Sequence, residues 1–338
     1  MRVTVLKKRK IEAAAGKKSA AGFDFPTSSV GSGQWLGADG KPVTVLYDPA
    51  TGATGLTTAL SVLKRVDSLM QYLDEVFGTR GFSGNVIVAP DFGGAYHADC
   101  NFNALGSGSD WYISESGQDA TFGLVMAEAC ESYMGLQNKG WNCGGSCGEG
   151  LSRFLAEVAT GGASGAMSAY TSGPSWDGLD WITHDQGTDQ DYSSIGCSVL
   201  YFWWMISQGF TVRQLCQTGA PDGTLASNYA LLTKKPAGQA FANFKSAVAA
   251  IVGSGSMTND NPWNAATPPF PPAVPTPTPT PTPAPAPAPA PTAGLTLDEA
   301  IAAVQDGIDS IRPWYDLLTA EQAEAAAIAN LTAYWPKP

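Results

Sequence analysis

Three glutamates in the middle of the chain have a spacing that suits acid–base or metal chemistry. Glu128 and Glu131 stand three residues apart in the segment Ala-Glu-Ala-Cys-Glu, and Glu149 follows in Gly-Glu-Gly-Leu. Residues three apart on a helix project from the same face, so the first two carboxylates are expected side by side. They repel each other unless a cation, a shared proton or a donor such as Arg153 lies between them. The alternative is a half-exposed helix face with two solvated acids.

Histidine is scarce in this chain, which narrows the choice of an imidazole partner for the acids. There are 2 histidines. His97 follows Gly-Gly-Ala-Tyr on a predicted loop, from which it can fold over the glutamates, whereas His184 is expected to be a surface residue of a polar loop. We therefore take Glu128, Glu131, Glu149 and His97 as the candidate catalytic set. Such an oxygen-rich set with one nitrogen suits manganese, iron or a hard cation better than catalytic zinc.

The cysteines do not form a recognisable metal or disulfide framework. Six of them are spread over the chain without a C-x-x-C pair: Cys100, Cys130, Cys143, Cys147, Cys197 and Cys216. Cys143 and Cys147 lie in a glycine-rich loop, where each can bridge to the other or to Cys100, or stay a thiol. Cys130 and Cys197 fall in apolar helical patterns and are expected to be buried. A dyad of Cys143 or Cys147 with His97 has no support from the spacing.

The elements that must position these residues follow from hydrophobic periodicity and composition. Runs rich in β-branched or aromatic residues predict strands at 43–47, 86–89 and 110–114. Apolar residues spaced by three and four predict helices at 56–77, 122–134 (ended by Gly135), 148–158, 195–207, 211–217 and 241–252. The order predicts an α+β fold, with a small N-terminal sheet and a mainly helical second half.

The region around the acids resembles the gluzincin metallopeptidases. Residues 122–157 combine a helix carrying Glu-x-x-Glu, a loop of glycines and cysteines, and a second helix opened by Gly-Glu-Gly-Leu. In that family the first helix carries H-E-x-x-H, and a glutamate from a following helix completes the zinc site. The resemblance implies a zincin-like fold, with Glu128 as the general base and Glu149 as the third ligand. Ala127 and Glu131 stand at the histidine positions, so ordinary zinc hydrolysis is not expected.

Other phrases resemble those of a group of uncharacterised bacterial proteins. They are Gly-Glu-Gly-Leu-Ser-Arg-Phe-Leu at 148–155, the segments at 189–191 and 194–200, and Asn-Asp-Asn-Pro at 259–262. This resemblance implies no activity.

Composition divides the chain into four parts. Residues 1–27 contain lysine and arginine clusters and are expected to be a basic disordered tail. The main domain is expected at 28–265. Residues 266–293 alternate proline with threonine or alanine, a pattern that favours extended polyproline II and a semi-rigid linker. Residues 294–338 show two helix starts and predict a small helical hairpin that attaches to an assembly.

Charge and hydropathy exclude some classes of partner. The formal net charge of -11 disfavours a nucleic-acid binder, because phosphate binding needs a basic surface. No apolar stretch reaches the ~20 residues of a membrane span, and no classical signal peptide is recognised. Charged residues make up only 14% of the chain, which is commoner in exported proteins, although the compartment is not determined by this.

Three functional hypotheses follow. The first is a catalytically degenerate metallopeptidase-like domain that binds a protein or peptide and is tethered through the proline-rich linker to the helical module. The second is a hydrolase that uses the carboxylate-rich site for acid–base chemistry, without a cofactor or with a non-zinc metal. The third is a structural or anchoring protein of a larger assembly.

Overall fold

The computed structural model describes residues 25–97, 109–187, 190–253 and 255–271. The chain divides into two units, Met1–Thr276 and Pro277–Pro338, and every described residue belongs to the first. The predicted basic tail up to residue 24, most of the proline-rich linker and the helical hairpin at 294–338 lie outside the described residues. The architecture below is therefore that of the first unit alone.

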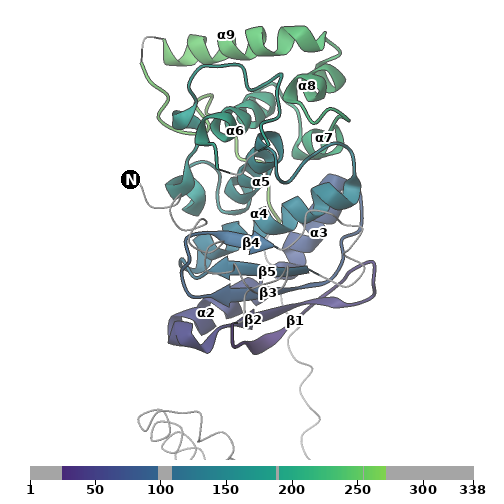
Figure 1. Cartoon of the computed structure of the whole chain (residues 1–338), viewed down its shortest axis with the longest axis vertical. Helices are drawn as coiled ribbons and strands as arrows, with labels where there is room; N and C mark the ends of the chain where they lie inside the picture. The colour runs from purple at the N-terminus through teal and green to yellow at the C-terminus, as the bar shows by residue number, and fades with distance from the viewer. Residues whose placement is uncertain (1–24, 98–108, 188–189, 254, 272–338) are drawn as a thin grey trace, which may run out of the picture. The chain divides into compact units, whose positions relative to one another are not determined.

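A five-stranded mixed sheet forms the N-terminal half of the unit (Figure 1). Its spatial order is β1-β2-β3-β5-β4, with bounds Ser28–Leu36 (β1), Pro42–Tyr47 (β2), Gly84–Ala89 (β3), Ala95–His97 (β4) and Ser109–Ser114 (β5). The three central strands β2, β3 and β5 run parallel, and both edge strands are antiparallel to their neighbours. The three predicted strands are thus confirmed, and they form the buried centre of the sheet.

Both edge strands escape a prediction from sequence pattern. β1 has the sequence Ser-Ser-Val-Gly-Ser-Gly-Gln-Trp-Leu and pairs with β2 through irregular register, so it lacks a run of β-branched residues. β4 is only three residues long. His97 was expected on a loop, but it is the last residue of β4. Pairing with β5, and not local propensity, makes this segment a strand.

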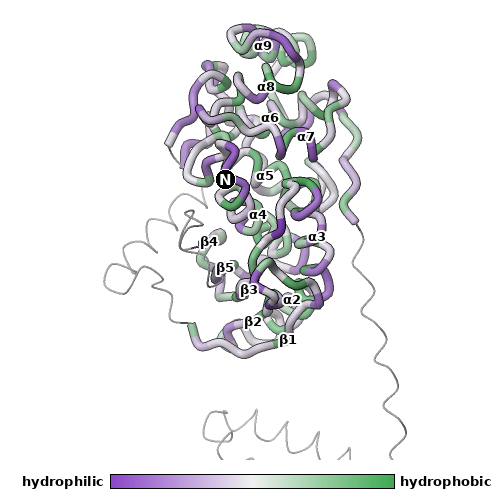
Figure 2. The backbone as a smooth tube through the Cα atoms, turned by 90° about the vertical axis from the view of Figure 1, so that its right-hand side faces the viewer, coloured by the Kyte–Doolittle hydropathy of each residue, from purple (hydrophilic) through white to green (hydrophobic). Residues whose placement is uncertain are grey.

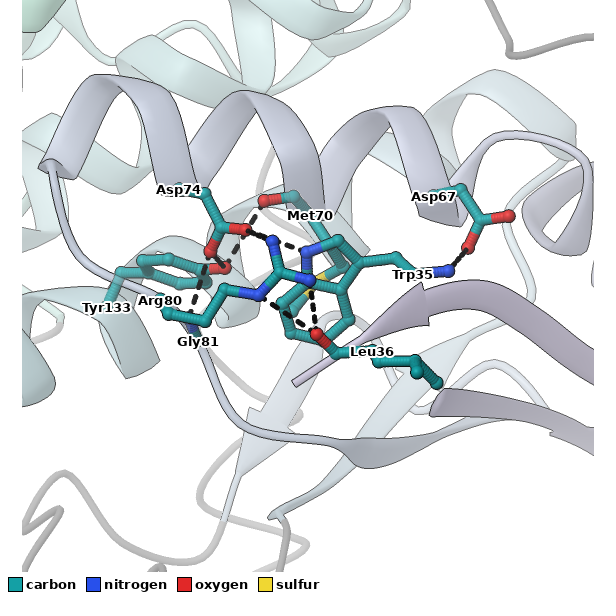
Figure 3. A network of polar contacts seen from close by, with 8 residues as sticks. All are labelled: Trp35, Leu36, Asp67, Met70, Asp74, Arg80, Gly81 and Tyr133. Atoms are coloured by element: carbon teal, nitrogen blue, oxygen red, sulfur yellow. Dashed lines mark hydrogen bonds and ion pairs between the residues drawn. The ribbon is translucent and has the colours of Figure 1, made fainter. Parts of the chain in front are cut away.

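The single helix expected at 56–77 is two helices. α2 spans Gly52–Leu63 and α3 spans Val66–Phe77, with Lys64 and Arg65 between them. Contacts with β1 fix the position of α3, because Asp67 in its first turn accepts the backbone N–H groups of Gln34 at 2.8 Å and of Trp35 at 2.9 Å. Figure 3 shows the contact with Trp35. The apolar period continues across the break, so the pattern does not show it.

The second half of the unit is helical, which confirms the α+β prediction. The helices are α4 (Gln118–Gln137), α5 (Ser146–Ala159), α6 (Tyr192–Ser207), α7 (Val212–Gln217), α8 (Leu225–Thr233) and α9 (Ala240–Val252). Short 3-10 turns lie at Pro49–Thr51, Ala166–Tyr170, Gly173–Ser175 and Ala237–Gln239. Of these six α-helices, all except α8 were predicted from the sequence, and Thr211 caps α7 as predicted. Gly135 does not end α4; the helix continues to Gln137 and closes on Asn138 at a left-handed φ of 50°.

The helix α4 is the centre of the hydrophobic core. Every residue from Thr121 to Met134 is buried, because α4 packs on β5, α2 and α3 on one side and on α5 on the other. Figures 1 and 2 show α4 and α5 in the middle of the unit, between the sheet and the outer helices α8 and α9. A functional group on α4 is therefore held by the best-packed part of the fold.

The last described residues continue to pack on this core. Phe270 places its ring 5.1 Å from that of Tyr72 on α3 and 6.0 Å from that of Phe122 on α4. Asp260 accepts the backbone N–H of Gly173 at 2.5 Å. Residues 255–271 thus pack against the unit past residue 265, where the linker was expected to begin.

Within the described residues, no helix combines the length and apolar character needed to cross a membrane.

Candidate functional site

The site begins at the edge strand β4, which carries His97. The segment before β4 is held by Ser114, whose hydroxyl oxygen accepts the backbone N–H groups of Phe92, Gly93 and Gly94 at 3.0–3.1 Å. Antiparallel pairing then places His97 opposite Trp111 of β5. The indole of Trp111 donates to the hydroxyl of Ser132 on α4 at 3.0 Å, which ties the sheet to the helix at this level. These contacts fix the backbone of His97 and thereby the position of its imidazole.

Two glutamates of α4 lie next to this imidazole. Nδ1 of His97 lies 2.5 Å from Oε2 of Glu128 and 3.7 Å from Oε2 of Glu131. All three residues are buried, with exposed fractions of 9%, 8% and 7% respectively. Glu128 and Glu131 lie on one face of α4, as predicted. That face is buried, so the alternative of a half-exposed face with two solvated acids is wrong. The partner they require is His97.

Arg153 does not lie between the acids, although it was considered for that role. Its guanidinium donates to the hydroxyl of Ser172 at 2.9 Å and lies 5.2 Å from the centre of the Tyr192 ring. Burial raises the pKa of Glu157 on the same helix, and the positive charge of Arg153 opposes part of this rise, so Arg153 acts on a different carboxylate. The only histidine beside His97 is likewise elsewhere: the ring of His184 contacts Thr183 and the carbonyl of Asp180 on its own exposed loop.

Cys143 joins the group from the loop between α4 and α5. One ligand atom each of His97, Glu131 and Cys143 lie within 4.8 Å of one another, and all three residues are buried. The loop is held by Trp141, whose indole donates to the carbonyl of Cys216 at 3.0 Å. Cys143 is disulfide-bonded, and Cys147 is a free thiol, so these two do not bridge to each other. Cys100, the other partner considered, lies outside the described residues.

Glu149 lies in the first turn of α5 and is half-buried. The start of this helix is fixed by Asp185, which accepts the backbone N–H of Cys147 at 3.0 Å. Burial chiefly raises the pKa of the Cys130 thiol on α4, and the negative charges of Glu131 and Glu149 raise it further. Glu149 therefore adds negative potential to the part of α4 that carries the site.

Sequence reasoning missed Cys143 as a member of the group and also missed a second buried acid pair. Glu157 of α5 accepts the indole N–H of Trp203 at 2.6 Å and forms a hydrogen bond with Asp260. Burial, followed by the neighbouring Asp260, raises the pKa of Glu157 to about 10. The pair therefore holds a proton at neutral pH. No spacing rule links Glu157 to Asp260, because they are about a hundred residues apart and only the fold brings them together.

The chemistry available at the His97 site is proton transfer and cation binding. A carboxylate in contact with one ring nitrogen fixes the tautomer of an imidazole and favours its protonated form. Buried carboxylates and an imidazole are also ligands of divalent metals. Ala127, in contrast, offers no coordinating atom next to Glu128.

No family model matches this chain, and no curated protein matches it significantly.

Proposed function

We propose that the unit is a hydrolase that uses Glu128, His97 and Glu131 for general acid–base catalysis. The observation that carries the proposal is the 2.5 Å contact between Nδ1 of His97 and Oε2 of Glu128 in a buried setting. A histidine that shares a proton with a carboxylate is the commonest general acid or base in enzymes. Perturbed and paired titratable groups concentrate at such sites.

Energetics favour a working site over an inherited one. Burying charged groups costs several kcal/mol each, and buried ion pairs can often be replaced by apolar residues without loss of stability. Apolar residues would thus fill the space between β4 and α4 at a lower cost in free energy than Glu128, Glu131 and His97. Acid–base chemistry gives a reason to keep titratable groups at this position.

The roles follow from the geometry. Glu128, at hydrogen-bonding distance from Nδ1, orients the imidazole and takes up or returns its proton. The second carboxylate, Glu131, lies 3.7 Å from the same nitrogen and stabilises the imidazolium that forms when His97 accepts a proton from water. His97 then returns this proton to the leaving group of the substrate. Glu149, in the first turn of α5, contributes negative potential to this part of α4.

The resemblance to gluzincin metallopeptidases supports the assignment of Glu128 and suggests a peptide-like substrate. Parallel strands precede a helix with the two acids, a glycine-rich loop follows, and the next helix has Glu149 in its first turn. We propose that the unit is zincin-like and that His97, reaching α4 from β4, compensates for the missing histidine at Ala127. Fold analogy alone does not establish an activity, so the site geometry remains the main support.

Hydrolysis of labelled casein and of a p-nitrophenyl ester by the purified full chain tests the proposal. Glu128→Gln and His97→Gln should each lower kcat/KM by about 10²–10⁴-fold, the usual contribution of general acid–base catalysis. His184→Gln is the matched control, since His184 is exposed and bonded only within its loop among the contacts described above. Absence of hydrolysis, or equal rates in wild type and both site variants, contradicts the proposal.

A second candidate is a binding protein that has lost its chemistry. The observation in its favour is Ala127, which leaves no ligand at the first metal position of the resemblance. Under this hypothesis a protein or peptide occupies the site. The predicted helical module at 294–338, joined through the proline-rich linker, serves as an anchor. Hydrolysis separates the two, because the binding-only protein should cleave neither casein nor the ester. A stoichiometric transition metal that is lost in Glu149→Ala would also contradict the binding-only hypothesis.

A further inference from the structure

The disulfide of Cys143 lies at the candidate site and not in a remote part of the fold. The sulfur is within 4.8 Å of a ligand atom of His97 and of a carboxylate oxygen of Glu131. In the disulfide form this sulfur is not a thiolate, so it is a poor metal ligand. A change in its redox state therefore changes the donor set at the centre of the unit.

We propose that reduction of the Cys143 disulfide completes a site for zinc or cobalt, formed by His97, Glu131 and Cys143. The oxidised protein offers an imidazole and carboxylates there, which suit harder cations. The reduced protein adds a thiolate. The site is thus switched from oxygen-rich to a mixed nitrogen, oxygen and sulfur set, which is the set that Zn²⁺ and Co²⁺ prefer.

The distances fit a four-coordinate ion with small adjustments. Ligand atoms about 2.0–2.3 Å from a tetrahedral zinc stand roughly 3.3–3.8 Å from one another. One ligand atom each of His97, Glu131 and Cys143 lie within 4.8 Å of one another. This limit exceeds the tetrahedral separations by about 1.0–1.5 Å, so the three side chains close in by no more than that when an ion binds. Three protein ligands leave the fourth position for water.

Glu128 gains a defined part in this arrangement. It contacts Nδ1 of His97, so in the neutral imidazole that donates from Nδ1 the lone pair is on Nε2. A carboxylate that accepts the proton of one ring nitrogen while the other nitrogen binds metal is the usual second-layer partner of a ligating histidine. Glu128 therefore positions His97 for the metal and is not a member of the three-ligand set.

The redox step is a dithiol–disulfide exchange. A dithiol such as dithiothreitol is oxidised to its cyclic disulfide, and its two electrons and two protons convert the protein disulfide into two thiols. The Cys143 thiol then loses its proton to solvent when it binds the metal. Reoxidation by a small disulfide, which is itself reduced to two thiols, reverses the step and removes the sulfur ligand.

The free thiols of the described residues do not compete for the ion. Cys130, Cys147, Cys197 and Cys216 are fully buried, and burial raises the pKa of each thiol well above its ordinary value. Thiolates are the metal-binding form, so these four are weak ligands at neutral pH. A thiolate-to-metal signal can thus be assigned by substitution of Cys143.

Cobalt titration of the full chain tests the inference. Protein reduced by dithiothreitol and freed of it under anaerobic conditions should bind about one Co²⁺ with a thiolate-to-cobalt charge-transfer band, and the oxidised protein should lack that band. Cys143→Ser should abolish the band, and His97→Gln should weaken affinity more than the 10–100-fold that loss of an outer partner costs. Cys147→Ser is the matched control and should keep it.

The cobalt-binding test must not depend on whether a variant is folded or active. Reduced wild type and reduced His97→Gln both lack the cross-link, so a difference in cobalt affinity between them is due to the imidazole, and near-ultraviolet circular dichroism checks that each variant is folded. Equal cobalt binding by oxidised and reduced protein, no binding by either, or a band that survives Cys143→Ser overturns the inference. The metal site and the proposed hydrolase share His97 and Glu131, but the test of the metal site measures cobalt binding and not hydrolysis. A failure of the oxidised protein to hydrolyse substrate therefore contradicts the proposed hydrolase and leaves the metal site untouched.

Discussion

His97 and Glu128 come from an edge strand and a central helix, and their side chains meet with Nδ1 and Oε2 2.5 Å apart. The strand contributes position, since pairing with β5 fixes the backbone of His97. The helix contributes rigidity, because α4 is buried along most of its length. This pairing turns two neighbouring acids into a site that can transfer a proton.

The first prediction concerns the charge balance of that site. His97→Ala should lower the free energy of unfolding by about 3 kcal/mol, because it removes the imidazole that contacts the buried carboxylate of Glu128 and faces that of Glu131. Adding Glu128→Gln to this variant should recover part of the loss, since one uncompensated charge disappears. Urea unfolding of the single and double variants measures the coupling, expected at roughly 1–3 kcal/mol. His184→Ala should change stability by no more than about 0.5 kcal/mol, and strictly additive losses in the site variants would contradict the pairing.

The second prediction concerns Asp74 of α3, which joins β1, the segment after α3 and helix α4 (Figure 3). Its carboxylate accepts the indole N–H of Trp35 at 2.7 Å, the guanidinium of Arg80 at 2.8 Å, the N–H of Gly81 at 2.9 Å and the hydroxyl of Tyr133 at 2.6 Å. Asp74→Asn replaces an acceptor oxygen by a donor and should cost about 3 kcal/mol in urea unfolding.

Asp119 supplies the control for Asp74. It forms an ion pair with Arg65 at 2.7 Å, but its side chain is 68% exposed. Asp119→Asn should therefore cost no more than about 1 kcal/mol. If Asp74→Asn costs as little as Asp119→Asn, the network in Figure 3 is not a stabilising one.

Elements with a strong local signal could be predicted from the sequence. The central strands β2 and β3 are rich in β-branched residues, α5 and α9 have regular apolar periods, and α6 is an almost continuous apolar run. β1 and β4 could not be predicted, since their strand conformation comes from pairing with a neighbour and not from their composition. The break between α2 and α3 is likewise set by contacts of Asp67 with β1.

The candidate site was predictable in its acids but not in its assembly. The spacing of Glu128 and Glu131 predicts their common face, because three residues make nearly one helical turn. The contact with His97 depends on a strand that the pattern does not reveal. The approach of Cys143 depends on how the loop after α4 folds, which Trp141 fixes through a residue of α7 far along the chain.

The third prediction concerns pH and the acid pair of Glu157 and Asp260. The pKa of Glu157 is raised from 4.5 to about 10 in the folded protein, so the folded state holds a proton that the unfolded state releases between these values. The free energy of unfolding should be highest below about pH 4.5 for this group and fall as the pH rises towards 10. A single group contributes at most about 1.4 kcal/mol per pH unit.

Substitution of Glu157 isolates that contribution. Glu157→Gln cannot ionise and should flatten the decrease in stability between pH 6 and 9, as measured by urea unfolding at each pH. Glu75→Gln, on the exposed side of α3, should leave the wild-type slope unchanged. A slope in Glu157→Gln equal to that of wild type would show that Glu157 does not hold the proton.

The last prediction concerns the packing of Phe270 beyond the expected start of the linker. Its ring lies against Tyr72 and Phe122, two residues of the core helices α3 and α4. Phe270→Ala in the full chain should lower the free energy of unfolding by about 1–2 kcal/mol, because apolar area and two aromatic contacts are lost. Ile251→Ala is the control, since Ile251 is 49% exposed on α9 and its truncation should cost less. Equal effects of the two substitutions in thermal or urea unfolding would mean that the segment at 266–271 does not stabilise the unit and that the linker begins near residue 266.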